Sequence, residues 1–259
     1  MRIALVAPPY ESVPPKKYGG TERVVDLLAR GLHARGVDVT VFATGDSRTA
    51  GRLRSVVPEA LRPKLDELPL GTGIFHLQML TELLGSLDDF DLIHNHDDFW
   101  TMPILATRRV PLLTTLHGRL DLPGLGDAYR SFARPGHAMI SISHAQRRPV
   151  PDLPWAANIP HGLALASVRA RVDAPPAPSD GEYLAFLGRF CDDKGPVEAI
   201  RIAQESGMPL KIAAKIEGKA MQQYFDEKIR PHLDGRNIEY VGRSEEHTSE
   251  LQSRLHLVC

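Results

Sequence analysis

The sequence predicts an α/β protein that opens with a doubly wound parallel sheet, and three neighbouring segments predict it. Residues Ile3 to Ala7 form a continuous apolar run, which is typical of a strand buried on both faces. From Thr21 to Arg35 apolar residues recur at helical spacing, and Gly36 stands where a C-terminal cap belongs. Residues Val37 to Val41 then alternate as a second strand. Together these segments make a βαβ unit.

The stretch Tyr18 to Val25 opens this first helix and follows a proline-rich loop. Gly19 and Gly20 let the backbone turn tightly and leave amide N–H groups uncovered, and Thr21 can cap the helix. Because a helix N-terminus attracts anions, the stretch predicts a site for the phosphate of a nucleotide, a sugar nucleotide or a phosphorylated acceptor. An ordinary strand-to-helix turn is the alternative interpretation.

The rest of the first half continues the alternation of strands and helices. The polar, proline-punctuated segment from Asp46 to Leu70 is expected to be irregular, with at most a short helix. Elements are expected at 74–87 and 100–107 as helices and at 91–96, 111–116, 138–143 and 156–159 as strands. Loops at the carboxyl edge of such a sheet bind ligands, so Gly19, His96 and His117 are expected at that edge.

A linker and a second α/β domain are expected in the remainder. Residues 166–180 are rich in Ala, Pro and Arg without an apolar period, which indicates a linker between a first domain at 1–165 and a partial second domain at 181–242. The second domain is expected to hold strands at 183–187, 210–214 and 238–241 and helices at 194–206 and 218–233, the latter ended by Pro231.

Composition narrows the class of protein. The chain has 31 Lys and Arg against 32 Asp and Glu, a balance that argues against a general nucleic-acid binder. It shows no signal-peptide pattern and no apolar stretch long enough to span a bilayer, which predicts a soluble protein and leaves peripheral membrane contact open. Cys191 and Cys259 are too few for a disulfide framework, so a cytoplasmic location is expected.

The last residues look foreign to the α/β pattern. From Arg243 to Ser253 the sequence reads RSEEHTSELQS, which matches the in-frame translation of a common sequencing adapter at every position. Residues 243–259 are therefore expected to be a non-native tail on a truncated second domain, and no functional inference rests on them.

Several blocks together resemble the family 4 glycosyltransferases, which have the GT-B fold of two Rossmann-like domains. The blocks are Pro14–Val25, Gly36–Ser47, the DLIHNH strand at 91–96, TLHG at 115–118, and FLGRF with DKGP at 186–196. The resemblance runs from Met1 to about Gly242 and implies a complete N-terminal acceptor-side domain followed by part of a donor-binding domain. It also implies transfer of a sugar from a nucleotide-sugar donor, with retention of configuration and without a resident cofactor.

The resemblance assigns donor contacts to basic residues of the second domain. Negative charge builds on the leaving diphosphate as the sugar acquires oxocarbenium character, so cations and oriented N–H dipoles are needed there. Arg189 and Lys194 would supply the cations, and Lys215 resembles a further basic contact. Gly19 and Gly20 would face the same phosphates or a phosphorylated acceptor. For Arg189 and Lys194, two solvated loop cations are the alternative.

The resemblance places His117 close to the transferred sugar as the catalytic candidate; a strand-end histidine bonded to backbone is its alternative. Thr21, His96 and Asp97 are expected on the acceptor side of the cleft, although Asp97 can equally cap the following helix. His94 and His96 share one side of a strand, which raises a His-x-His metal site. No third ligand is evident, so no metal is expected.

Other functions stay open at this stage. A nucleotide-sugar epimerase of related fold and a non-catalytic sugar-nucleotide-binding or interaction protein are the alternatives to a glycosyltransferase of the hexosyl-transferring class. A nicotinamide-dependent dehydrogenase is disfavoured because the first turn lacks the Gly-x-Gly-x-x-Gly pattern. The sugar, the base and the acceptor, whether saccharide, lipid-linked or small molecule, are not specified.

Overall fold

The computed structural model describes residues 1–16, 19–55, 57–105, 107–163, 183–216 and 218–242, and for Asp66 only the backbone. The chain divides into two compact units between Ala164 and Leu165, and each is considered by itself. The expected linker at 166–180 and the expected tail at 243–259 lie outside the described residues.

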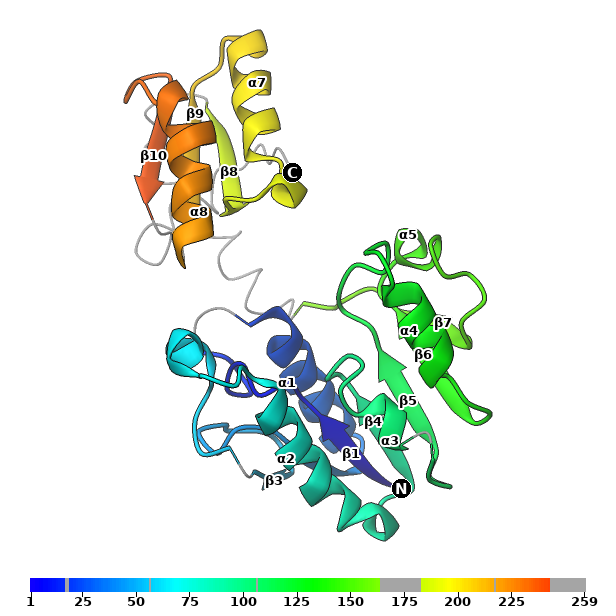
Figure 1. Cartoon of the computed structure of the whole chain (residues 1–259). Coiled ribbons are helices and arrows are strands. Elements are labelled where there is room, and N and C mark those ends of the chain that lie inside the picture. The colour runs from blue at the N-terminus through cyan, green and yellow to red at the C-terminus, as the bar shows by residue number, and fades with distance from the viewer. Residues whose placement is uncertain (17–18, 56, 106, 164–182, 217, 243–259) are drawn as a thin grey trace. The chain divides into compact units, whose positions relative to one another are not determined.

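The first unit is built on a seven-stranded parallel sheet (Figure 1). Its strands are β1 (Arg2–Val6), β2 (Asp38–Phe42), β3 (Arg52–Arg54), β4 (Leu92–Asn95), β5 (Leu112–Thr115), β6 (His137–Ser141) and β7 (Trp155–Asn158). They lie in the order β3-β2-β1-β4-β5-β6-β7. The predicted α/β class with a doubly wound parallel sheet is confirmed. The order reverses between β1 and β4, and at such a switch point the loops diverge and leave a crevice.

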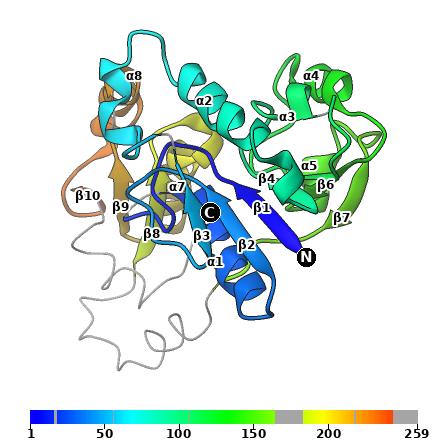
Figure 2. The same ribbon diagram turned by 90° about the horizontal axis from the view of Figure 1, so that it is seen from below.

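Helices cover both faces of this sheet. The described α-helices are α1 (Gly20–His33), α2 (Gly73–Leu84), α3 (Met102–Leu105), α4 (Leu125–Phe132) and α5 (His144–Arg147), with short 3-10 turns at Arg62–Glu67 and Leu87–Asp89. Figure 2 shows the sheet between α1 and α2. Because side chains alternate along a strand, Ile3 and Leu5 pack with α1, whereas Ala4 and Val6 face α2.

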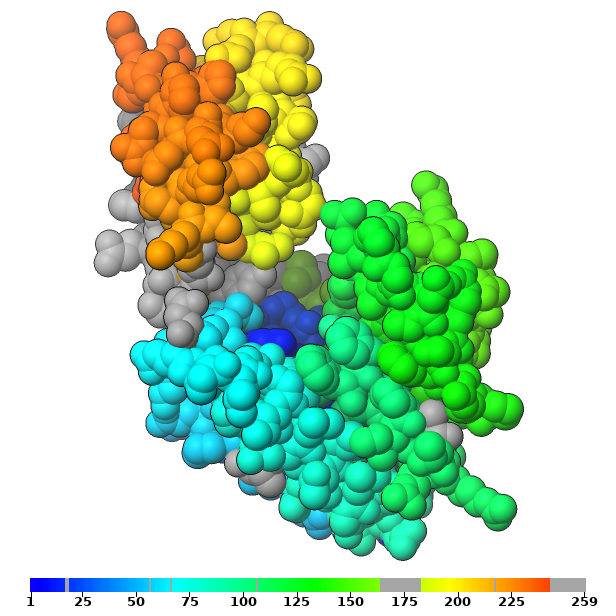
Figure 3. Space-filling view, in the orientation of Figure 1, coloured from blue at the N-terminus to red at the C-terminus, as the bar shows by residue number. Residues whose placement is uncertain are grey.

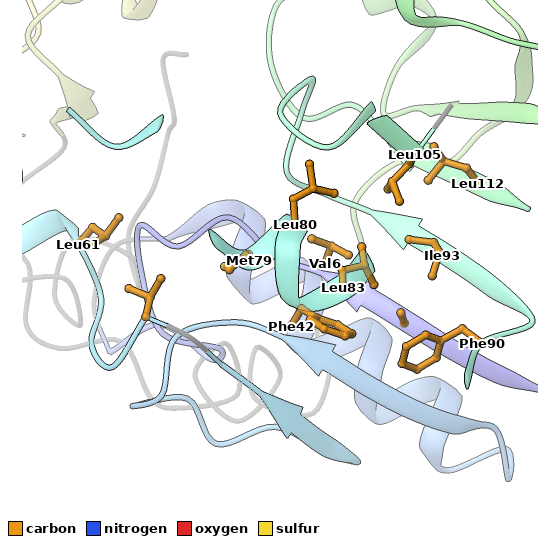
Figure 4. Packing of buried hydrophobic residues seen from close by; sticks show 12 residues of the cluster. Val6, Phe42, Leu61, Met79, Leu80, Leu83, Phe90, Ile93, Leu105 and Leu112 are labelled. Carbon is orange, nitrogen blue, oxygen red and sulfur yellow. The ribbon is translucent and has the colours of Figure 1, made fainter. Parts of the chain in front are cut away.

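The face under α2 forms the largest apolar cluster of the first unit. Met79, Leu80 and Leu83 of α2 lie against Phe42 of β2 and Ile93 of β4, all at most 2% exposed (Figure 4). A core packed on both sides of the sheet holds the strand ends, and the loops that follow them, in fixed positions.

Three elements of the first unit differ from the sequence expectation. The strand β3 lies inside the segment that was expected to be irregular, and α4 and α5 were not predicted. Strand β3 is a short edge strand, and Arg52 and Arg54 point charged side chains to Asp38 and Asp89. A charged edge strand shows no apolar alternation, which explains why it was missed.

The second unit contains a three-stranded parallel sheet in the order β10-β9-β8. The strands are β8 (Leu184–Arg189), β9 (Leu210–Lys215) and β10 (Ile238–Gly242), and the α-helices are α7 (Pro196–Ser206) and α8 (Gly218–Tyr224). The helix predicted at 218–233 is broken: a π-helical turn at Phe225–Ile229 and a 3-10 turn at Arg230–His232 follow α8. Pro231 lies inside this last 3-10 turn, so the helical segment stops at His232, one residue after the proline, whereas the α-helix itself ends at Tyr224.

Among the described residues, no helix combines the length and the apolar character that crossing a membrane requires.

Candidate functional site

The loop that follows β1 ends at the glycine pair and is held by the neighbouring chain. Val13 is fully buried, its N–H donates to Ser47 Oγ at 2.9 Å, and its carbonyl accepts from the Arg48 N–H at 2.8 Å. These contacts fix the position of Val13 in the segment before α1. In the space-filling view the blue start of the chain lies recessed between the cyan and green parts of the first unit (Figure 3).

The two glycines have different roles. Gly19 has φ of +146°, and a Cβ there would lie 2.6 Å from Pro15 Cβ, so the position requires glycine. Gly20 is exposed, already helical, and has nothing within 4 Å of where a Cβ would be. Thr21 does not cap the helix: it lies in the first turn, and Gly19 is the cap residue without a side-chain hydrogen bond. The expectation for Thr21 as the cap was therefore wrong by two positions.

Glu22 is a buried carboxyl group in this same turn. It is 3% exposed, and burial raises its pKa to about 7, although hydrogen bonds from the backbone of Glu22 and Glu11 and the nearby Arg62 charge favour the ionised form. A Cβ on Gly19 would lie 3.0 Å from Glu22 Oε2. Glycine at 19 thus makes room for an acid that lies inside the first turn of α1.

Histidines that follow three different strands form a chain at the carboxyl edge. His96 comes directly after β4, His117 comes after β5, and His161 comes after β7. The His96 Nδ1 and His117 Nε2 atoms lie 2.9 Å apart, and His117 Nδ1 lies 3.2 Å from His161 Nε2. The expected meeting of His96 and His117 at this edge is confirmed. His94 lies beside them, with its ring 4.3 Å from that of His96 and its Nε2 2.8 Å from Thr115 Oγ1.

Burial keeps these imidazoles neutral. It lowers the pKa of His94 to about 4 and that of His117 to about 3, and it lowers the pKa of His96 and of His161 as well. Protonating one ring would also place a charge beside the next, which is why neighbouring histidines add to the effect on His96 and His117. Each ring therefore offers one donor and one acceptor nitrogen.

The structure places His96 and Asp97 deeper than the sequence suggested. His96 is 2% and Asp97 1% exposed, so neither side chain lies open to an acceptor. The Asp97 carboxylate lies 2.8 and 2.9 Å from His76 Nδ1 and therefore does not cap the helix that follows. Burial raises the Asp97 pKa to about 6, opposed by this hydrogen bond. Trp100 stacks on the His76 ring at 4.7 Å.

An open hollow of about 520 Å³ adjoins His117. It lies between the loop after β5, with Gly118 and Arg119, and the segment after β6, with Ser143 and with Gln146 of α5. The Gln146 amide nitrogen donates to the carbonyls of Leu116 and Gly118 at 2.9 and 2.7 Å, so one side chain ties the two segments together. Polar and charged groups line the hollow beside apolar ones such as Leu120 and Ile142, and the Arg119 guanidinium there donates to Asp121.

His94 of β4 and His96 just after it do not belong to a metal-ligand set in the part of the chain that the structure describes. No group of three or more His, Cys, Asp or Glu side chains is arranged there to hold a metal ion. His94 and His96 are instead engaged with Thr115 and His117.

In the second unit the basic candidates also follow strand ends. Arg189 ends β8 and Lys215 ends β9, and the two residues are register partners in the parallel pair. Lys194 is exposed and lies two residues before α7 begins at Pro196. Arg189 Nη2 is 3.9 Å from Asp193, and its buried Nε has no hydrogen-bond partner among the described residues. Three cations thus lie at or beside one sheet edge.

Sequence reasoning missed three residues of these sites: His76, His161 and Glu22. His161 follows β7 as His117 follows β5, so the carboxyl-edge rule that found His117 could have found it. His76 lies within α2, and Glu22 lies within the first turn of α1. Their burial depends on contacts across the fold, which spacing along the chain does not reveal.

Comparison with known proteins decides the family. Residues 18–162, more than half of the chain, match the sequence model of Glycosyltransferase Family 4. The chain belongs to this family. It is 30% identical over 227 aligned residues to the D-inositol 3-phosphate glycosyltransferase of Acidothermus cellulolyticus, with 72% of this chain and 50% of that protein covered.

Solved structures of glycosyltransferases share the fold of this family 4 member. AviGT4, a glycosyltransferase involved in avilamycin A biosynthesis, is 27% identical with a TM-score of 0.59, covering 93% of this chain and 64% of AviGT4. HepE of Anabaena, solved in complex with UDP and glucose, is 14% identical with a TM-score of 0.58, covering 94% and 69%. The chain spans about half the length of its Acidothermus relative.

Proposed function

We propose that this family 4 protein transfers a sugar from a nucleoside-diphosphate sugar to a hydroxyl acceptor, with retention of configuration. Family membership carries the reaction class and the expectation of retention. The observation that carries the donor class is the set of cations in the second unit, where Arg189 and Lys215 end neighbouring strands and Lys194 precedes a helix. HepE, solved with UDP and glucose, supports UDP-sugars as the first donors to test.

The reaction requires cationic groups and N–H donors at the diphosphate. Breaking the sugar–phosphate bond leaves negative charge on the diphosphate, and Arg can bind its oxygens in a bidentate manner while Lys acts as a point charge. The buried Nε of Arg189 has no partner among the described residues, so a phosphate oxygen could supply one. The N-terminus of α7 adds backbone N–H dipoles close to Lys194.

The first unit carries candidate contacts of its own. Gly20 is exposed and unobstructed at the start of α1, which allows a phosphate to approach the backbone, and Thr21 follows it in the same turn. His117 borders the hollow, from which a substrate hydroxyl could reach its ring. His96 and Asp97, being buried, would act through His117 and His76 and not by direct contact.

Titration of the protein with UDP-, GDP- and ADP-sugars tests the proposal. We expect one of them to bind and to be slowly hydrolysed. The variant Arg189→Ala should weaken binding roughly ten- to hundredfold, because a hydrogen bond to a charged group is worth about 1.5–3 kcal/mol. Arg189→Ala combined with Lys194→Ala should abolish it.

The matched control is Arg201→Ala, which removes an exposed cation from α7 of the same unit. Its affinity should equal that of the wild type. If no sugar nucleotide binds or is hydrolysed, the proposed function fails; if the double variant retains wild-type affinity, the assignment of Arg189 and Lys194 fails. A panel of acceptors should include D-inositol 3-phosphate, after the Acidothermus relative.

A further inference from the structure

Both ring nitrogens of His117 are engaged by other imidazoles. Its Nε2 lies 2.9 Å from Nδ1 of His96, and its Nδ1 lies 3.2 Å from Nε2 of His161. The three neutral rings therefore form a directional chain, in which each ring can donate at one nitrogen only. Protons can point either inward, from His161 to His96, or outward, from His96 to His161.

The buried end of the chain decides the direction. His96 Nε2 is buried and has no hydrogen-bond partner among the described residues. The inward arrangement would place an N–H on that nitrogen and leave a buried donor unpaired. The outward arrangement leaves only an unpaired acceptor at His96 Nε2, which costs less free energy than a buried unpaired donor. It also puts the free N–H of exposed His161 in water.

We propose that His96 and His161 are positioning residues that hold His117 as its Nδ1–H tautomer. His96 does so from the buried side by donating its Nδ1–H to His117 Nε2. His161 does so from the exposed side by accepting the His117 Nδ1–H at its own Nε2. His117 thereby keeps one defined donor, on the side that faces away from the core.

The consequence for ligand binding rests on the proposed function. Since the only N–H of His117 is already donated to His161, a sugar or acceptor oxygen can bond to His117 only by replacing the His161 ring. His161 is exposed and follows the last strand of the sheet, so its ring can be displaced without opening the core. It occupies the position of a ligand oxygen until substrate arrives.

Nitrogen NMR of the whole chain with isotope-labelled histidine tests the tautomer directly, without any need for activity. We expect the His117 signals to show a protonated Nδ1 and an unprotonated Nε2. His161→Leu removes the acceptor and should move both His117 signals part of the way toward the average of the two tautomers, because the donor at His96 remains. His161→Gln can accept with its side-chain oxygen and should restore them. A protonated Nε2 in the wild type, or unchanged signals in His161→Leu, would overturn the proposal.

On the buried side, His96→Asn keeps a donor near the position of Nδ1 and should keep the Nδ1–H tautomer, whereas His96→Leu should lose it. Should His96→Leu not fold, the wild type and the exposed-site variants still decide the matter. The control is His144→Leu, an exposed histidine of α5, which should leave the His117 signals unchanged.

Addition of UDP separates this inference from the proposed function. Titration of the wild type with UDP, followed by calorimetry, reports nucleotide binding independently of the histidine signals. If UDP does not bind, the proposed function fails while the tautomer result stands. If UDP binds but His117 is protonated at Nε2, only the positioning roles of His96 and His161 are refuted.

Discussion

Asp97 is a buried acidic residue outside the histidine chain. Its carboxylate is 1% exposed and lies against one ring nitrogen of His76, itself 1% exposed. A carboxylate withdrawn from water in this way depends on its hydrogen bond with His76. Asp97 directly follows His96, so its hydrogen bond to His76 also helps to fix the chain segment that holds His94 and His96.

Replacing His76 should therefore lower the free energy of unfolding more than replacing Asp97. We expect His76→Leu to lower the free energy of unfolding by about 3–5 kcal/mol at neutral pH, because it strands a buried carboxylate. Asp97→Asn keeps an oxygen that can accept from His76 and should cost only about 1 kcal/mol. Urea unfolding measures both. A His76→Leu variant within 1 kcal/mol of the wild type, by that same measure, would contradict a structural role for the pair.

The start of α1 shows what an element requires of its sequence. The glycine pair was expected to turn the backbone tightly, but only Gly19 has a positive φ, and its surroundings leave no room for a Cβ. Gly20 has neither constraint, so its small size is not explained by packing. An open backbone at a helix start suits the approach of an anion.

The two glycines should accordingly respond differently to alanine. Gly19→Ala should destabilise the protein by roughly 2–4 kcal/mol, from backbone strain and from contact with Pro15. Gly20→Ala should leave stability unchanged or raise it by up to about 1 kcal/mol, since alanine is the better helix former. Thermal and urea unfolding of both variants measure the contrast. Equal losses would show that Gly20 also has a packing role.

Elements buried on both faces were the ones the sequence predicted well. Strand β1 carries a continuous apolar run, and the rule that parallel strand ends share an edge correctly placed His96 and His117 at the same edge. Edge strand β3 escaped prediction because its side chains are charged. The His76–Asp97 pair escaped because it joins α2 to the loop after β4, a contact that no local period encodes.

At the scale of the molecule, the first unit contains buried groups whose titrations oppose one another. Burial lowers the pKa of several histidines and raises that of Glu22 and of Asp97. A lowered histidine pKa contributes stability that is present above about pH 6.5 and is lost as the pH falls. A raised carboxyl pKa acts in the other direction, because the folded state takes up the proton more readily. The change in the free energy of unfolding of the wild type with falling pH is therefore the difference between larger contributions of opposite sign.

Single variants should separate these contributions. Because the pKa of His94 is about 4, the wild type should lose about 2 kcal/mol of its free energy of unfolding as the pH falls from 7 to 5. His94→Gln lacks this loss, so it should become more stable relative to the wild type by that amount over the interval. Glu22, with a pKa of about 7, takes up its proton in the folded state over the same interval, so Glu22→Gln should become less stable relative to the wild type by about 2 kcal/mol. Urea unfolding at several pH values measures both differences, with His33→Gln as the exposed control. Differences that do not change with pH, or that share one sign, would show that these side chains titrate in the folded protein as they do in water.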